Sequence, residues 1–156
     1  MSTSRVVLWS GLMGKFCFDP AVDQSHLMMI AAGSGVTPFV SIMREYARLL
    51  GQPGAPQKMS LLVAFRSEKD LICWQELNDM KSNSRIKIIT TLSRSHVSGF
   101  EFGRVDMKKI QDFLPENPTE ATYMTCGPDD MMRLVVETVR ATGVPEVQIK
   151  MESFTS

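Results

Sequence analysis

The apolar residues of the predicted strands fall into four predominantly apolar stretches and one alternating stretch. The predominantly apolar stretches are residues 26–32, 59–65, 86–91 and 121–126. Strands that are apolar on both faces are typical of a parallel sheet covered by helices on both sides. In the last stretch, Val147, Ile149 and Met151 alternate with polar residues. This alternation predicts a half-exposed strand at the edge of the sheet.

Apolar residues recur at helical spacing after each of the four predominantly apolar stretches. Pro38 and Pro128 fit the first turns of two of these helices, because a residue at that position needs no backbone N–H. Asp70 and Asp106 stand where helix N-caps belong, before two shorter helical segments. Gly143 is placed to end the last helix.

This alternation of strands and helices indicates an α/β fold: a five-stranded parallel sheet with helices on both faces. Right-handed crossovers predict the strand order 3-2-1-4-5, provided that the chain returns to the other side of strand one after strand three. In such a sheet, ligands bind outside the carboxyl ends of the strands where the order reverses, here between strands one and four. Residues 33–38 and 126–128 lie at those two ends.

The stretch 33–38 is therefore the first candidate binding site. Gly33 and Gly35 permit a tight turn and a close approach by a ligand. The helix that follows has no carboxylate in its first turn, so its free N–H groups and its positive end are open to an anion such as phosphate. From these residues alone, a phosphate site and a plain turn between strand and helix remain equally open. If it is a site, a bulky residue at Gly35 should abolish binding and leave the fold intact.

Composition narrows the function classes. The 156 residues are 44% hydrophobic and 22% charged with a net charge of zero, which favours one domain and gives no reason to expect nucleic acid or an anionic membrane as partner. No apolar run is long enough to span a membrane. Three widely spaced cysteines argue against a disulfide framework and for a reducing compartment, the cytoplasm. The two histidines have no second ligand type at metal spacing, so no metal site is expected.

A series of short motifs carries a family resemblance. The motifs are residues 33–38, 66–71, 93–94, 103–105, 126–128 and 152–154. In this order and spacing they resemble the pyridine-nucleotide domain of ferredoxin–NADP reductase-like flavoenzymes. That family includes cytochrome b5 reductases, the reductase components of oxygenases, and flavohaemoglobins. The resemblance covers nearly the whole chain.

The resemblance implies a nicotinamide end of the site. The stretch that would lie along the pyrophosphate and the nicotinamide ribose consists of Gly33, Ser34, Gly35, Val36, Thr37 and Pro38. Cys126 would face the nicotinamide carbon that carries the hydride, and Gly127 and Pro128 would shape that wall. Glu152 would lie near the flavin and the nicotinamide, although it could also be a solvated residue of an edge strand. Cys126 could equally be a buried small side chain; its place before a helix predicts a lowered thiol pKa.

The resemblance also implies an adenosine end of the site. The residues expected around the adenosine 2′ position are Arg66, Ser93, Arg94 and Arg104. Guanidinium groups bind a 2′-phosphate through bidentate hydrogen bonds, so NADP is the expected cofactor and NAD is the alternative. Glu68 could fill the role of the carboxylate that NAD-preferring relatives place near the ribose. Without the resemblance, the arginines could be plain solvated charges, and Ser93 could cap a turn.

One part of the family pattern is missing. The family places a flavin-binding barrel with an Arg-x-Tyr-Ser/Thr signature before this domain, and the nearest string here, at residues 44–47, ends in alanine and lies inside a predicted helix. Residues 11–18 look like the last barrel segment. We therefore expect residues 1–24 to be a barrel remnant with a linker and residues 25–156 to be an NAD(P)-binding domain. No tight FAD site is expected.

These expectations lead to one functional hypothesis and one alternative. The chain is expected to be the NAD(P)H-binding domain of a flavin-dependent electron-transfer oxidoreductase. It would position the nicotinamide for hydride transfer to FAD on a missing barrel, and the complete flavoprotein would reduce a redox protein. Whether the chain by itself is an enzyme stays open. The alternative is a non-catalytic nucleotide-binding or docking module that acts with a partner flavoprotein.

Overall fold

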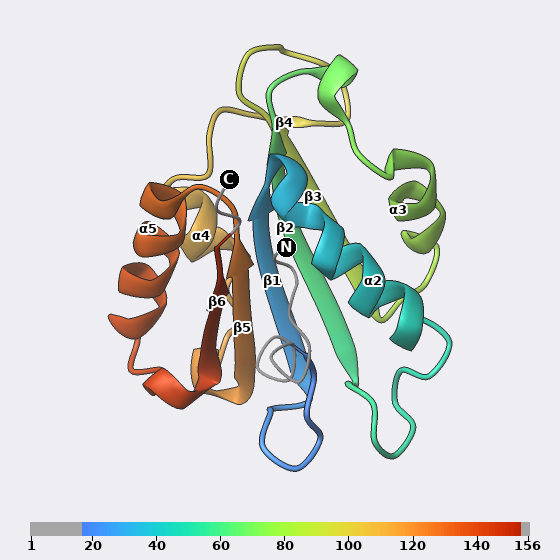
Figure 1. Cartoon of the computed structure of the whole chain (residues 1–156), viewed down its shortest axis with the longest axis vertical. Helices are drawn as coiled ribbons and strands as arrows, with labels where there is room; N and C mark the ends of the chain where they lie inside the picture. The colour runs from blue at the N-terminus through green and yellow to red at the C-terminus, as the bar shows by residue number, and fades with distance from the viewer. Residues whose placement is uncertain (1–16, 154–156) are drawn as a thin grey trace.

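A six-stranded parallel sheet forms the centre of the computed structural model, which describes residues 17–153 (Figure 1). Its strand order is β4-β3-β2-β1-β5-β6, and every neighbouring pair is parallel. The strands are β1 (His26–Ala32), β2 (Lys58–Phe65), β3 (Ile86–Leu92), β4 (Glu101–Phe102), β5 (Ala121–Cys126) and β6 (Ile149–Glu152).

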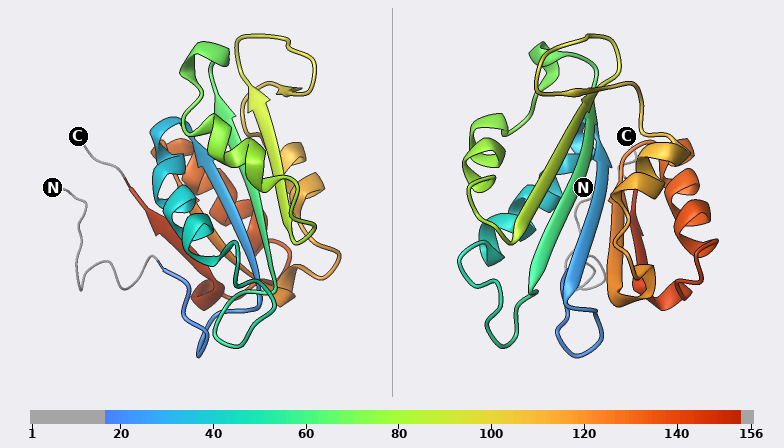
Figure 2. Two further views of the ribbon diagram at one scale, coloured as in Figure 1. Left: turned by 90° about the vertical axis from the view of Figure 1, so that its right-hand side faces the viewer. Right: turned by 180° about the vertical axis from the view of Figure 1, so that it is seen from behind.

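Helices cover both faces of the sheet (Figure 2). The α-helices are α2 (Thr37–Tyr46), α3 (Trp74–Met80), α4 (Met107–Phe113) and α5 (Asp129–Arg140). Short 3-10 helices are η1 (Gly33–Val36), η2 (Glu68–Asp70), η3 (Pro118–Glu120) and η4 (Glu146–Gln148). Helices α2 and α3 pack on one face, and α4 and α5 pack on the other.

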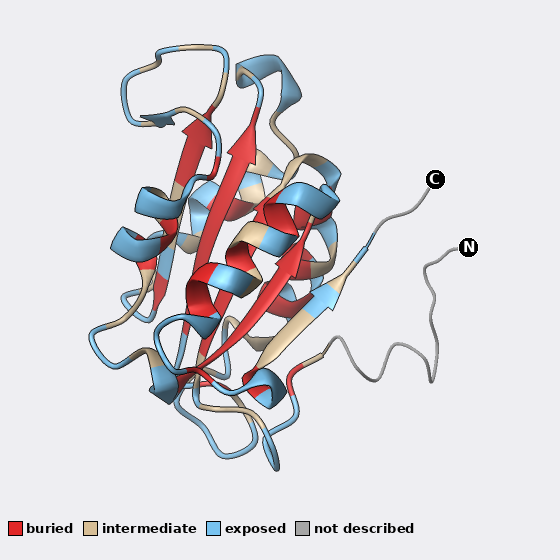
Figure 3. Ribbon diagram, turned by 90° about the vertical axis from the view of Figure 1, so that its left-hand side faces the viewer, coloured by how far each residue is buried: buried red, intermediate tan, exposed pale blue. Residues whose placement is uncertain are grey.

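The central strands β1, β2 and β5 are buried on both faces, as their predominantly apolar sequences predict (Figure 3). Along β1, Leu27 and Met29 enter the core under α2 and α3, while Met28 and Ile30 enter the core under α4 and α5. The α/β class and the coverage of both faces are confirmed. The glycine-rich stretch, residues 33–38, follows β1 directly, so it begins where the buried strand ends.

The predicted number of strands is wrong, because β4 forms a sixth strand. The other five strands follow the predicted order 3-2-1-4-5. Strand β4 lies in a polar stretch to which the sequence pattern assigns no strand, and it pairs with only Thr91 and Leu92 of β3. Two hydrogen bonds made by Gly103 hold β4 beside β3. The Gly103 N–H donates to the Leu92 carbonyl (2.8 Å), and the Gly103 carbonyl accepts from Thr91 Oγ1 (2.7 Å). Both residues of β4 are exposed, so no apolar pattern marks it.

The two predicted caps have different outcomes. Asp106 caps α4 as expected, because its carboxylate accepts a hydrogen bond from the Lys109 N–H at 2.8 Å. Asp70 does not cap α3. Helix α3 begins at Trp74, with Cys73 in the left-handed conformation (φ 54°) as its N-cap, and Asp70 instead ends η2.

The edge strand is confirmed but shorter than its alternating pattern. Strand β6 contains only exposed and half-buried residues. Val147 lies in η4 and is 66% exposed, whereas Gln148 is buried. The Gln148 side-chain amide donates to the carbonyl oxygens of Thr119 (2.9 Å) and Ala121 (2.8 Å), which explains why a polar residue is covered here.

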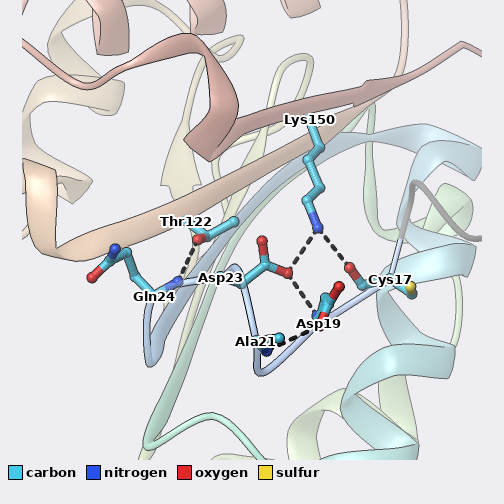
Figure 4. Close-up of polar contacts among 7 residues, drawn as sticks. All are labelled: Cys17, Asp19, Ala21, Asp23, Gln24, Thr122 and Lys150. Atoms are coloured by element: carbon cyan, nitrogen blue, oxygen red, sulfur yellow. Dashed lines mark hydrogen bonds and ion pairs between the residues drawn. The ribbon is translucent and has the colours of Figure 1, made fainter.

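A covered ion pair joins β6 to the segment that precedes β1 (Figure 4). Lys150 Nζ contacts Asp23 Oδ2 at 2.7 Å and donates to the Cys17 carbonyl oxygen at 2.8 Å. The exposed fractions of the two charged side chains are 18% for Lys150 and 1% for Asp23. The Asp19 N–H also donates to Asp23 Oδ2, and the Gln24 N–H donates to Thr122 Oγ1. Residues 17–24 are thus attached to β5 and β6.

Residues 1–16, which contain most of the predicted barrel remnant, lie outside the described residues. Within the described range 17–153, no helix combines the length and the apolar character needed to cross a membrane. The same range contains no group of three or more His, Cys, Asp or Glu side chains that could hold a metal ion.

Candidate functional site

A pocket of about 1000 Å³ opens at the carboxyl ends of β1, β2, β3 and β5, where the strand order reverses. The structure brings nine of the predicted site residues together in its lining. They are Gly33, Ser34, Gly35, Arg66, Ser93, Arg94, Arg104, Gly127 and Pro128. Residues separated by up to 95 positions in the sequence therefore share one site, because parallel strands all end at the same edge of the sheet.

The two glycines of the stretch 33–38 serve different purposes. Gly33 has φ 58°, and nothing lies within 4 Å of the position a Cβ would take, so its backbone faces open space. A Cβ on Gly35 would lie 2.2 Å from the carbonyl oxygen of Cys126. Gly35 is thus required for η1 to pack against the end of β5. The expectation that a bulky residue at Gly35 leaves the fold intact is wrong.

The start of α2 is free of negative charge. Neither η1 nor α2 has an acidic residue in its first turn, and no side chain caps the N-terminus of either helix. Thr37 Oγ1 donates a hydrogen bond back to the Ser34 carbonyl at 2.8 Å and so stabilises the turn. The Thr37 N–H is already paired with the Ser34 carbonyl, so the positive end of the helical segment formed by η1 and α2 lies at η1. Gly33, Ser34 and Gly35 of η1 line the pocket, as an anion site requires.

Three exposed arginines form the opposite part of the pocket. Backbone hydrogen bonds continue the pairing of β2 with β3 beyond the strand ends. The Ser93 N–H donates to the Phe65 carbonyl at 2.9 Å, and the Arg94 N–H donates to the Arg66 carbonyl at 2.8 Å. Arg104 follows β4, which pairs with β3 on the side away from β2. None of the three forms an ion pair with a carboxylate of residues 17–153, so their charges are available to a ligand.

The remaining predicted residues do not line the pocket. They are Val36, Thr37, Pro38, Cys126 and Glu152. Val36 and Cys126 are fully buried. The neighbouring strands place Glu152 beside Cys126, and the thiol pKa is raised to about 12, chiefly by burial and also by the charge of Glu152. The expected lowering of this pKa is therefore wrong, and the thiol stays protonated at neutral pH.

The pocket also contains residues that sequence reasoning did not assign to it. Asp70 and Ile72 enter from the segment after β2, and Asp130, Met131 and Leu134 enter from the first turns of α5. Asp70 was interpreted as a helix cap, and the apolar residues of α5 as core. Their apolar and polar patterns are those of an ordinary helix and turn, so only the three-dimensional arrangement shows that they reach the site.

This arrangement fits an elongated ligand that carries more than one anionic group. Residues 33–35, at the acid-free start of η1, lie on one side of the pocket. Three guanidinium groups with no ion-pair partner among residues 17–153 lie on the other. The open space at Gly33 permits contact with the backbone itself. Fold and site together define a nucleotide-binding α/β domain.

Comparison with known proteins identifies the family. Residues 29–137 match the family described as the oxidoreductase NAD-binding domain, and the chain belongs to this family. It is 29% identical over 143 residues to NADH-cytochrome b5 reductase 1 of Candida glabrata, covering 89% of this chain and 49% of that protein. It is 32% identical over 115 residues to nitrate reductase [NAD(P)H] of Zea mays, covering 71% of this chain and 49% of that protein.

Solved structures show the same fold. The cytochrome b5 reductase domain of Ulva prolifera nitrate reductase has a TM-score of 0.71 at 23% identity, covering 83% of this chain and 49% of that one. The chain spans about half or less of the length of the curated relatives it matches. The resemblance to the nucleotide domain of ferredoxin–NADP reductase-like flavoenzymes is thus confirmed, and with it a site for NAD or NADP.

Proposed function

We propose that the chain binds NADPH in this pocket and presents its nicotinamide to a flavin held outside residues 25–156. The observation that carries the proposal is that the acid-free start of η1 and three guanidinium groups without an ion-pair partner among residues 17–153 line one pocket. The names of the relatives support the reaction class, since they include NADH-cytochrome b5 reductases and nitrate reductases. When bound, the nicotinamide would supply a hydride, and the protein would contribute binding and orientation.

Within this proposal, each side of the pocket has a role. The backbone of residues 33–35, where the helical segment begins, binds the pyrophosphate, helped by the positive end of that segment. Arg66, Arg94 and Arg104 bind the adenosine end of the nucleotide. Gly127 and Pro128 form the wall beside the nicotinamide. Cys126 and Glu152 act from behind this wall, because Cys126 is buried and its protonated thiol is neither a base nor a nucleophile at neutral pH.

The exposed arginines support a preference for NADP over NAD. A 2′-phosphate at an exposed rim would receive hydrogen bonds from charged groups that have no other partner among residues 17–153. Ser93, which also lines the pocket, adds no negative charge there. Glu68, which could have filled the role of the carboxylate near the ribose, does not line the pocket.

Replacing one guanidinium group tests this assignment. Arg94→Ala is expected to weaken NADP+ binding about tenfold and to leave NAD+ binding nearly unchanged, because only NADP+ carries the 2′-phosphate. Isothermal titration of both nucleotides measures the two affinities, and the difference should shrink at high salt. Arg48→Ala removes an exposed arginine that does not line the pocket and serves as the control. Equal loss for NAD+ and NADP+ in Arg94→Ala would contradict the assignment.

We also propose a division of the chain and a cellular setting. Residues 17–24 act as the linker to a flavin-binding domain, which is supported by their attachment to β5 and β6 through Lys150 and Thr122. The complete flavoprotein would pass electrons to a redox protein, and the chain by itself would not hold FAD tightly. The three cysteines form no disulfide within residues 17–153, which supports a cytoplasmic location. A non-catalytic nucleotide-binding module that acts with a partner flavoprotein remains the second candidate, supported by the buried, protonated thiol of Cys126.

A further inference from the structure

Two surface segments form the walls of the pocket on the side of the three arginines. The first wall, residues 66–73, follows β2, and the second wall, residues 93–104, follows β3. The first wall contributes Arg66 to the pocket lining, and the second contributes Arg94 and Arg104. A hydrogen bond from the Arg94 N–H to the Arg66 carbonyl, at 2.8 Å, joins the walls where they leave the sheet. Farther from the sheet, side chains join them.

An aromatic contact connects the two walls at this distance from the sheet. Trp74, the first residue of α3, follows the first wall directly, and Phe100 belongs to the second wall. Their ring centroids lie 5.1 Å apart with the planes tilted by 30°, a separation at which aromatic rings attract each other. Neither ring lines the pocket. Any effect of this pair on a ligand must therefore act through the walls.

The backbone on each side holds its ring in place. Cys73 has φ 54°, a left-handed conformation that is unfavourable for cysteine and persists only where surrounding contacts enforce it. This conformation sets the direction in which α3, and with it Trp74, leaves the first wall. From the end of α3, Lys81 Nζ lies 4.7 Å from the centroid of the Trp74 ring. On the second wall, the Phe100 N–H donates to the Val97 carbonyl at 3.1 Å, and both side chains pack against the core.

We propose that Trp74 and Phe100 are positioning residues whose contact holds the two walls at the spacing that the adenosine end of the nucleotide requires. This inference rests on the proposed function. A wall that moves freely in the empty pocket must be ordered when the ligand binds, and the cost of this ordering lowers the affinity. The contact between the rings provides part of that order in advance. Its loss should weaken binding without removing any group that touches the ligand.

Trp74→Leu tests the inference, because it removes the ring and keeps an apolar side chain at a half-buried position. The probes are NADP+ and adenosine 2′,5′-bisphosphate, which lacks the nicotinamide and its ribose. Isothermal titration of the 156-residue chain measures both affinities. We expect both to fall about fivefold, since the adenosine end alone is affected. Trp74→Phe keeps an aromatic ring and should restore most of the wild-type affinity. Lys81→Met removes the nearby cation, leaves both rings and should retain the wild-type affinity.

A double-mutant cycle separates this contact from two independent effects. Phe100→Leu breaks the same contact from the second wall, so the double variant should bind about as weakly as each single variant. Losses that add up in the double variant would overturn the inference, because the two residues would then act independently. Wild-type affinity in Trp74→Leu would also overturn it. A loss for NADP+ but not for adenosine 2′,5′-bisphosphate would do the same, since the effect would then lie at the nicotinamide end.

The outcomes also distinguish this inference from the proposed function. If the wild-type chain binds neither probe, the proposed function itself fails, and the inference fails with it. If the wild-type chain binds both probes and the Trp74 and Phe100 variants bind them equally well, only the inference fails. Urea unfolding shows which variants are folded under the conditions of the titration. Phe100→Leu becomes the main test if Trp74→Leu is unfolded.

Discussion

Two groups of charged residues in this domain have opposite surroundings. At the linker, Lys150 and Asp23 are covered and paired, and they join segments 127 residues apart in the sequence. At the pocket rim, Arg66, Arg94 and Arg104 are exposed and have no ion-pair partner among residues 17–153. Charged side chains therefore contribute to the fold at the linker, whereas those at the pocket rim remain available to a ligand.

The physical difference between the two groups is the cost of removing one member. A covered charge that loses its partner keeps its desolvation penalty without the compensating attraction, so the fold loses stability. Asp23 has little room for such a loss, because its Oδ1 already lacks a hydrogen-bond partner among the described residues. An exposed arginine that is removed leaves nothing unpaired in the protein, so only ligand binding should change.

The largest effect is expected at the linker. Lys150→Met should lower the free energy of unfolding by about 3 kcal/mol, because it leaves the covered Asp23 carboxylate without its cation. The matched control is Lys108→Met, which breaks an ion pair with Asp112 whose side chains are 82% and 69% exposed. That variant should change stability by less than about 0.5 kcal/mol. Urea denaturation measures both; similar losses in the two variants would remove the distinction between covered and exposed pairs.

A smaller loss is expected where η1 packs against β5. Gly35→Ala should lower the free energy of unfolding by about 2 kcal/mol, since the added Cβ would lie 2.2 Å from the Cys126 carbonyl oxygen and the backbone must move. Gly33→Ala should cost about 1 kcal/mol, from its positive φ alone, because nothing lies near the added Cβ. Thermal unfolding compares the two variants. A Gly35→Ala protein as stable as the wild type would show that this contact is loose.

The smallest effect is expected at His26, a half-buried titratable side chain at the start of β1, at the end of the sheet opposite to the pocket. Burial lowers the pKa of His26, and the nearby charges of Lys58 and Lys87 lower it further. A histidine with a lowered folded pKa favours the unfolded state once it protonates, so stability should fall as the pH decreases from 6.5 through the folded pKa. Melting temperatures between pH 7.5 and pH 5 in the wild type and in His26→Gln isolate this contribution. An unchanged slope in the variant would assign the pH dependence to other groups.

The parts of the fold that the sequence predicts well are those with a repeating local pattern. Predominantly apolar stretches identify four strands because strands covered by helices on both faces carry few charged residues. Strand β4 escapes prediction because two exposed residues carry no pattern, and its register depends on hydrogen bonds between Gly103 and β3. Asp70 is misread as a cap because an acid before a helical segment has the same local sequence whether or not it reaches a pocket.

The sequence by itself determined the α/β class, the order of the five main strands, the glycine-rich stretch and the family to which the chain belongs. These follow from periodicity and from motifs that are read along the chain. The tertiary structure decided which charges are covered and which are exposed, that Gly35 is needed for packing, that Cys126 is a protonated buried thiol, and that Asp70 lines the pocket. The reason is that burial and electrostatic environment depend on neighbours far away in sequence, which no local pattern specifies.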